Sequence, residues 1–216
     1  MIGLGLAGAT GYLCGTVPTA DVVARRASGG TVDLRTAGSG NPGGANALAV
    51  LGTGAGVAVL AGDIAKGALA CGLGAVVGGR TGAHLAGTAA VVGHCHPVWN
   101  GFRGGKGVAA SVGQCLATFP AYFPIDVAVA AATASSPRWR RRAFSATAVS
   151  SACWVLGGVV WWRRDWPNLW GPQPTGALPL AAAVSSAVIA GRFLAGFRAA
   201  RPIEPEANTG EGRVDT

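Results

Sequence analysis

The sequence is poor in charged residues. Asp, Glu, Lys and Arg make up only 12% of its 216 residues, whereas a soluble domain carries about 25%. Hydrophobic residues make up 50%, and the mean hydropathy is +0.40. This composition excludes an ordinary soluble domain and predicts a chain that lies in a lipid bilayer.

Acidic residues are especially scarce. The chain has nine Asp and Glu against 17 Lys and Arg, which gives a formal net charge of +8. In a soluble protein this excess would suggest a nucleic-acid partner. The cytoplasmic loops of membrane proteins are also rich in Lys and Arg, so we expect the lipid bilayer as a partner and no nucleic acid.

Paired cysteines are missing as well. The five cysteines form no C-x-x-C pair and no regular spacing, so we expect neither a disulfide framework nor a metal site. His94 and His96 flank Cys95, but consecutive residues cannot easily converge on one ion. We therefore expect no metal and no cofactor.

What the chain does contain is a series of apolar runs separated by polar loops. A straight transmembrane helix needs about 20 apolar residues, and we predict an all-α integral membrane protein with about seven transmembrane helices. The expected ranges are 1–23, 47–78, 83–93, 108–123, 124–134, 143–162 and 176–195. Residues 1–200 would form one membrane domain, and the Pro-, Glu- and Gly-rich residues 201–216 a disordered cytoplasmic tail.

Two charges interrupt the second apolar run. Asp63 and Lys66 lie three residues apart, on one helical face where they can pair, and charges within a membrane usually face the protein interior. The run 47–78 is either one long tilted span or a broken pair of shorter ones.

Basic residues predict the orientation of the chain. With the N-terminus outside, 13 Lys and Arg lie in cytoplasmic segments, three lie outside and Lys66 lies within a span, as the positive-inside rule requires. This orientation places two glycine-rich loops on the cytoplasmic face, together with the C-terminus. We call residues 38–46 loop one and residues 94–107 loop two.

The two loops are the predicted functional site. Repeated glycine allows positive φ and a close approach to a ligand, so that several N–H groups can converge on one anion. Ser39, Asn41, Asn46 and Lys106 would add side-chain donors. We interpret the loops as two halves of one phosphate-handling site, although Lys106 could also be no more than a positive charge in a short cytoplasmic loop.

Two nucleotide motifs match only in part. Gly38-x-Gly40-x-x-Gly43 fits the dinucleotide fingerprint, but that motif requires a βαβ unit, and this chain supplies apolar spans instead. Loop two resembles a P-loop, but it has Asn100 in place of the first Gly and Gly107 in place of the Ser or Thr that holds magnesium. We reject both.

Several motifs in register resemble one family. They are residues 12–18 (YLCGTVP), 33–43 (DLRTAGSGNPG), 63–67 (DIAKG), 93–97 (GHCHP) and 102–109 (FRGGKGVA). Their order and spacing resemble the bacterial acyl-phosphate:glycerol-3-phosphate acyltransferases (PlsY). The resemblance implies a seven-helix enzyme of the bacterial inner membrane that moves an acyl group from acyl phosphate to the 1-hydroxyl of glycerol 3-phosphate. The product would be lysophosphatidic acid, formed without metal or nucleotide.

The resemblance also implies roles for residues of both loops. Ser39, Lys106 and His94 would be catalytic, with Lys106 holding phosphate and His94 shaping loop two. The residues expected to bind substrate or phosphate are Gly38, Gly40, Asn41, Gly43, Asn46, Arg35, Arg103, Gly104, Gly105, Gly107 and Arg192.

The chain departs from the family pattern at four positions. Ala45 and Ala49 stand where the family usually has Thr and Arg, and Gly191 and Leu194 stand where it has the His and Asn of a third motif. An alternative hypothesis is therefore a non-catalytic relative that binds anionic lipid or phosphate. A small transporter is a weaker alternative, because the sequence shows no internal repeat.

Overall fold

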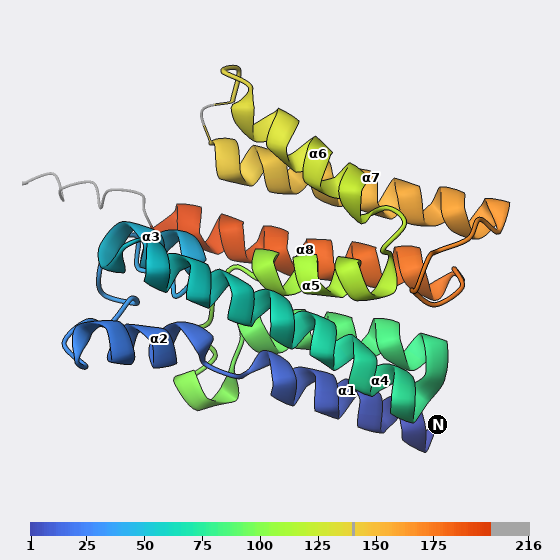
Figure 1. Cartoon of the computed structure of the whole chain (residues 1–216), viewed down its shortest axis with the longest axis horizontal. Helices are drawn as coiled ribbons and strands as arrows, with labels where there is room; N and C mark the ends of the chain where they lie inside the picture. The colour runs from blue at the N-terminus through green and yellow to red at the C-terminus, as the bar shows by residue number, and fades with distance from the viewer. Residues whose placement is uncertain (140, 200–216) are drawn as a thin grey trace, which may run out of the picture.

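The computed structural model describes residues 1–139 and 141–199, and this part of the chain is helical. Its elements are α1 (Ile2–Gly15), α2 (Thr19–Ser28), α3 (Gly44–Leu51), α4 (Thr53–Cys95), the 3₁₀ turn η1 (Val98–Asn100), α5 (Val108–Thr118), α6 (Phe123–Ser135), α7 (Arg142–Arg164) and α8 (Ala177–Ala199). Figure 1 shows the longer helices lying roughly side by side, with α6 and α7 forming an outer pair. The predicted tail, 201–216, lies outside the described residues.

The predicted first span, 1–23, is wrong in its second half. Helix α1 ends at Gly15, and α2 begins separately at Thr19. Pro18 causes the break, because it lacks an N–H and disfavours helical backbone at the residue before it. Helix α2 buries Ala20 and Ala24 and exposes basic residues on its other face.

The predicted span 47–78 also breaks, and not at its charges. Helix α3 ends before Gly52, whose φ of 88° lies in the region that favours glycine. Helix α4 then runs past Asp63 and Lys66 to a non-helical residue, Gly79 (φ 62°, ψ −155°). There the chain folds back on itself, and the predicted segment 83–93 forms the returning arm.

Small residues allow the two arms of α4 and their neighbours to pack closely. A Cβ added at Gly74 would collide with Gly82 of the returning arm, and one added at Gly11 of α1 would collide with Ala86. Helix α5 packs on the first arm in the same way, through Gly113. Such contacts are typical of helix interfaces in membranes, where small residues let backbones approach.

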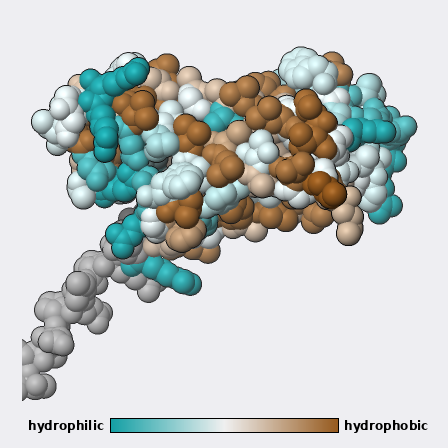
Figure 2. All heavy atoms as spheres, turned by 90° about the horizontal axis from the view of Figure 1, so that it is seen from below, coloured by the Kyte–Doolittle hydropathy of each residue, from teal (hydrophilic) through white to brown (hydrophobic). Residues whose placement is uncertain are grey.

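Among residues 1–139 and 141–199, three helical segments are long and apolar enough to cross a membrane by themselves: residues 53–100, 142–164 and 177–198. Helices α1, α5 and α6 are shorter than the ~20 residues of a straight span. Figure 2 shows hydrophobic side chains over the middle of one face and hydrophilic ones gathered at both ends of the long axis. This distribution suits a protein that sits across a lipid layer.

Candidate functional site

Loop two is fixed to the end of α4 by its own backbone. The Gly104 N–H donates to the Cys95 carbonyl and the Gly105 N–H to the His94 carbonyl, both at 3.1 Å. These two N–H groups are therefore bonded within the protein and not free for an anion. Gly105 has no room for a Cβ, which would collide with His94 Nε2 and lie 3.1 Å from the Pro42 carbonyl oxygen of loop one.

Arg192 of α8 holds the same two glycines from the other side. Its Nη2 donates to the Gly104 carbonyl at 2.7 Å and its Nε to the Gly105 carbonyl at 3.1 Å. A guanidinium suits this task because its donors form a rigid fork. Arg192, predicted to bind substrate, therefore braces loop two.

Lys106 turns away from this contact. Its ammonium lies 4.7 Å from the centre of the Phe193 ring of α8, in a cation–π arrangement. Partial burial lowers the Lys106 pKa from its usual value. Gly107 follows with φ 90° and caps α5, whose first N–H groups have no intrahelical partner.

Loop one is held together by Asn46. This side chain is 4% exposed. Its Nδ2 donates to the carbonyls of Leu34 and Ala37, both at 3.0 Å, and its Oδ1 accepts the Ser39 N–H at 2.8 Å. Both amide N–H groups are used, so Asn46 shapes the loop and has no donor left for phosphate. Ser39 itself is exposed.

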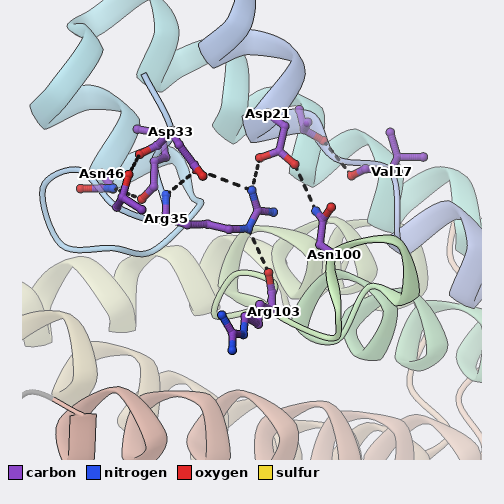
Figure 3. A network of polar contacts seen from close by, with 10 residues as sticks. Val17, Asp21, Asp33, Arg35, Asn46, Asn100 and Arg103 are labelled. Carbon is purple, nitrogen blue, oxygen red and sulfur yellow. Dashed lines mark hydrogen bonds and ion pairs between the residues drawn. The ribbon is translucent and has the colours of Figure 1, made fainter. Parts of the chain in front are cut away.

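An ion-pair network around Arg35, which precedes loop one, joins loop two to α2 (Figure 3). Arg35 pairs with Asp21 of α2 at 2.5 Å and donates through Nε to the Arg103 carbonyl at 3.2 Å. Asn100 donates to the other Asp21 oxygen at 3.1 Å. Arg35 thus ties the segment before loop one to loop two, and the Arg103 side chain remains exposed.

Three buried ionisable groups lie beneath this network. Asp63 Oδ1 is 2.8 Å from Lys66 Nζ and 3.5 Å from His94 Nδ1, so the predicted pairing of the two charges on α4 is confirmed. Lys66 also donates to the Val17 carbonyl at 3.0 Å, which fixes the connection between α1 and α2.

A pocket opens between these groups and the loops. Its walls include four residues that the sequence analysis selected: Arg35, His94, Gly104 and Gly105. The other selected residues lie outside its walls: Gly38, Ser39, Gly40, Asn41, Gly43, Asn46, Arg103, Lys106, Gly107 and Arg192.

Four further wall residues with a charged or amide side chain were not selected as site residues: Asp21, Asp63, Lys66 and Asn100. The rule that charges within a membrane mark functional sites would have pointed to Asp63 and Lys66. In the described ranges, no three His, Cys, Asp or Glu side chains lie close enough together to hold a metal ion.

An apolar groove adjoins the polar pocket. It runs between the α1–α2 connection and the first arm of α4, and its walls are Cys14, Val17, Thr19, Val22, Val23, Gly62, Ala65, Lys66 and Leu69. Val17, Thr19 and Lys66 line both hollows. The polar pocket and the apolar groove therefore share a wall that Val17, Thr19 and Lys66 form.

Comparison with known proteins decides the family. The sequence model named "Glycerol-3-phosphate acyltransferase" matches residues 5–197. The chain belongs to the glycerol-3-phosphate acyltransferase family. A member from Geobacillus kaustophilus is 37% identical over 156 residues, which are 72% of this chain and 76% of the relative.

Shorter matches are more similar. The member from Paramagnetospirillum magneticum is 48% identical over 118 residues, or 55% of this chain and 56% of the relative. The member from Exiguobacterium sibiricum is 45% identical over 113 residues, which are 52% of this chain and 54% of the relative. The chain thus spans about half the length of these two acyltransferase relatives.

The fold resembles that of a solved family member. The crystal structure of PlsY (YgiH), described as an integral membrane glycerol 3-phosphate acyltransferase in its glycerol 3-phosphate form, superposes with a TM-score of 0.71 at 25% identity. The match covers 90% of each chain. The family assignment and this likeness together support an all-helical membrane protein.

Proposed function

We propose that this protein transfers a fatty acyl group from acyl phosphate to the 1-hydroxyl of glycerol 3-phosphate and so forms lysophosphatidic acid. The observation that carries the proposal is the junction of the polar pocket with the apolar groove at Lys66. A substrate with a phosphate head and an acyl tail would place the head in the polar pocket and the tail in the apolar groove. Membership in the family supports the same activity.

The chemistry requires little beyond positioning. Acyl phosphate is a mixed anhydride: the glycerol oxygen bonds to the acyl carbon, the bond from that carbon to the phosphate oxygen breaks, and inorganic phosphate leaves with the electron pair and takes up the proton of the glycerol hydroxyl. Holding the two substrates together and stabilising the charge that develops can supply much of the rate. No metal or nucleotide takes part in this scheme.

Residues around loop two support the binding of two phosphate groups. Lys106 directly precedes Gly107, the N-cap of α5, and a helix N-terminus favours an anion. On the other side of the loop, Arg35 lines the pocket, whereas the Lys66 ammonium is held by Asp63 and the Val17 carbonyl. We infer that Lys106 holds a phosphate and that His94 and the exposed Ser39 contact the reacting groups.

We further propose seven membrane crossings: α1, the two arms of α4, α5, α6, α7 and α8. The N-terminus would lie outside the cell. In Figure 1 the N-terminus and the α7–α8 connection lie at one end of the molecule, and α2, α3 and the α6–α7 connection lie at the other. The basic residues near Arg141 and both loops then face the cytoplasm, as the positive-inside rule favours.

The test is acyl transfer by the purified protein from palmitoyl phosphate to radiolabelled glycerol 3-phosphate. Labelled lysophosphatidic acid that disappears in a Lys106→Ala variant supports the enzyme. Arg164→Ala at the opposite end of the molecule is the matched control and leaves the rate unchanged. Phosphate or lipid binding without any product would instead favour the non-catalytic relative, which the departures at Gly191 and Leu194 make a specific alternative.

A further inference from the structure

The floor of the pocket contains a chain of buried contacts. It begins at the Val17 carbonyl, passes through Lys66 and Asp63, and ends at His94, with distances of 3.0, 2.8 and 3.5 Å. Asp63 is 2% exposed, and Lys66 and His94 are each 8% exposed. Because α4 folds back at Gly79, the chain of contacts joins both arms of that helix.

The His94 ring lies between the carboxylate and the loops. Nδ1 faces Asp63 Oδ1 at 3.5 Å and makes no hydrogen bond in the described part of the chain, so Asp63 is the acceptor that lies within reach of it. The opposite nitrogen, Nε2, faces Gly105 where loop two approaches the Pro42 carbonyl of loop one. The ring therefore presents one nitrogen to an acid and the other to the place where the two loops meet.

We propose that Asp63 is a positioning residue: it holds His94 as the tautomer with a proton on Nδ1, so that Nε2 offers a free lone pair to the pocket. A neutral imidazole has one donor and one acceptor nitrogen, and a carboxylate can accept only from the donor. Lys66 offsets the charge of Asp63, which would otherwise be a buried, unpaired carboxylate.

The catalytic consequence rests on the proposed acyl transfer. A free Nε2 can accept a hydrogen bond from the glycerol hydroxyl and direct its oxygen towards the acyl carbon. Without Asp63 the proton can move to Nε2, and the nitrogen that faces the pocket becomes a donor. The hydroxyl then loses its acceptor, while the phosphate contacts are unaffected.

A paired substitution tests this without leaving a buried charge. Asp63→Asn combined with Lys66→Met removes both charges and preserves the approximate volume. We expect kcat to fall on the order of 10- to 100-fold, the usual effect of losing a partner that orients a functional histidine, and KM for glycerol 3-phosphate to change less than about threefold. Asp126→Asn, which changes an acid that contacts Ser150 of α7 away from the pocket, leaves kcat unchanged.

A double-mutant cycle separates positioning from an independent role. In a His94→Ala background, the same paired substitution changes kcat less than about twofold if Asp63 acts through His94. An equal loss in both backgrounds, an unchanged kcat in the folded paired variant, or a loss confined to KM would overturn the proposal. Thermal unfolding in detergent establishes that each variant is folded.

Histidine NMR provides a readout that needs no turnover. The chain has only three histidines, so ¹⁵N-histidine-labelled protein gives few ring signals, which His84→Gln and His96→Gln variants assign. We expect His94 to carry its proton on Nδ1 in the wild type and to lose this preference in the paired variant. A wild-type proton on Nε2, or a signal that the paired variant does not change, refutes the positioning role. Absence of acyl transfer with the expected spectra would refute the proposed function alone.

Discussion

Arg192 is the side chain through which α8 holds loop two. Arg192→Ala removes two charge-assisted hydrogen bonds, of 2.7 and 3.1 Å, to the Gly104 and Gly105 carbonyls. Such bonds contribute about 1.5 to 3 kcal/mol each, and because Arg192 is only half-buried we take the lower value, or about 3 kcal/mol for the pair. At about 1.4 kcal/mol for each factor of ten, this loss corresponds to roughly 100-fold.

The loss should be visible in catalysis and in the loop itself. In the Arg192→Ala variant the substrate must supply the free energy that closes the loop, so kcat/KM for glycerol 3-phosphate falls by about 100-fold. Hydrogen exchange at the Gly104 and Gly105 amides accelerates, because their bonds to the end of α4 open more often. Arg192→Lys retains one donor, and we expect its kcat/KM for glycerol 3-phosphate to fall by about tenfold.

Arg198→Ala is the matched control, since Arg198 is an exposed arginine further along the same helix. It should change kcat/KM less than about twofold, as surface substitutions usually do. The reasoning is refuted if Arg192→Ala keeps kcat/KM within about threefold of the wild type and its loop amides exchange no faster. Loop two would then hold its shape through its own backbone bonds.

Three further predictions concern the two loops and α8. Asn46→Ala breaks three hydrogen bonds inside loop one and should lower the free energy of unfolding by about 2 to 3 kcal/mol; an unchanged denaturation midpoint would contradict the bracing role. Burial lowers the Lys106 pKa, so the ammonium loses its charge at a lower pH than an exposed lysine would. KM for glycerol 3-phosphate should therefore rise as pH rises through that lowered pKa in the wild type and stay flat in Lys106→Arg; equal profiles would show that Lys106 does not bind the phosphate. A Cβ at Gly191 meets no atom within 4 Å and Leu194 is 50% exposed, so the Gly191→His, Leu194→Asn double variant should fold. Its kcat/KM should rise by about tenfold, the value of one regained charge-assisted contact. An unchanged kcat/KM in the folded variant would argue that the chain does not use the third motif.

Part of the site could be predicted from residue types and spacing. The i, i+3 spacing of Asp63 and Lys66 predicts their pairing. The glycines of loop two predict N–H groups that converge on an anion, but those of Gly104 and Gly105 are bonded to carbonyls at the end of α4. The pairing of Arg35 with Asp21 could not be predicted in this way. It depends on the break at Pro18, which turns α2 so that an acid of α2 meets a base of the following loop.

Donor residues in the loops were harder to assign. Asn46 and Arg192 have the side chains expected for phosphate binding, but their donors bond to backbone carbonyls of the protein. The residue type shows that a hydrogen-bond donor is present, but it does not show which acceptor lies nearest to that donor. Most side-chain hydrogen bonds go to backbone or water, and only the folded loops show which carbonyls are within reach.

The sequence by itself determined the environment and the secondary structure. An apolar chain in lipid must satisfy its backbone polar groups internally, so its apolar runs can only be helices, and glycine and proline mark where they break. Tertiary structure alone decided which charges share a pocket. Because α4 reverses at Gly79, His94 returns to the side of Asp63, and this long-range contact depends on the packing of small residues between the two arms rather than on any local pattern.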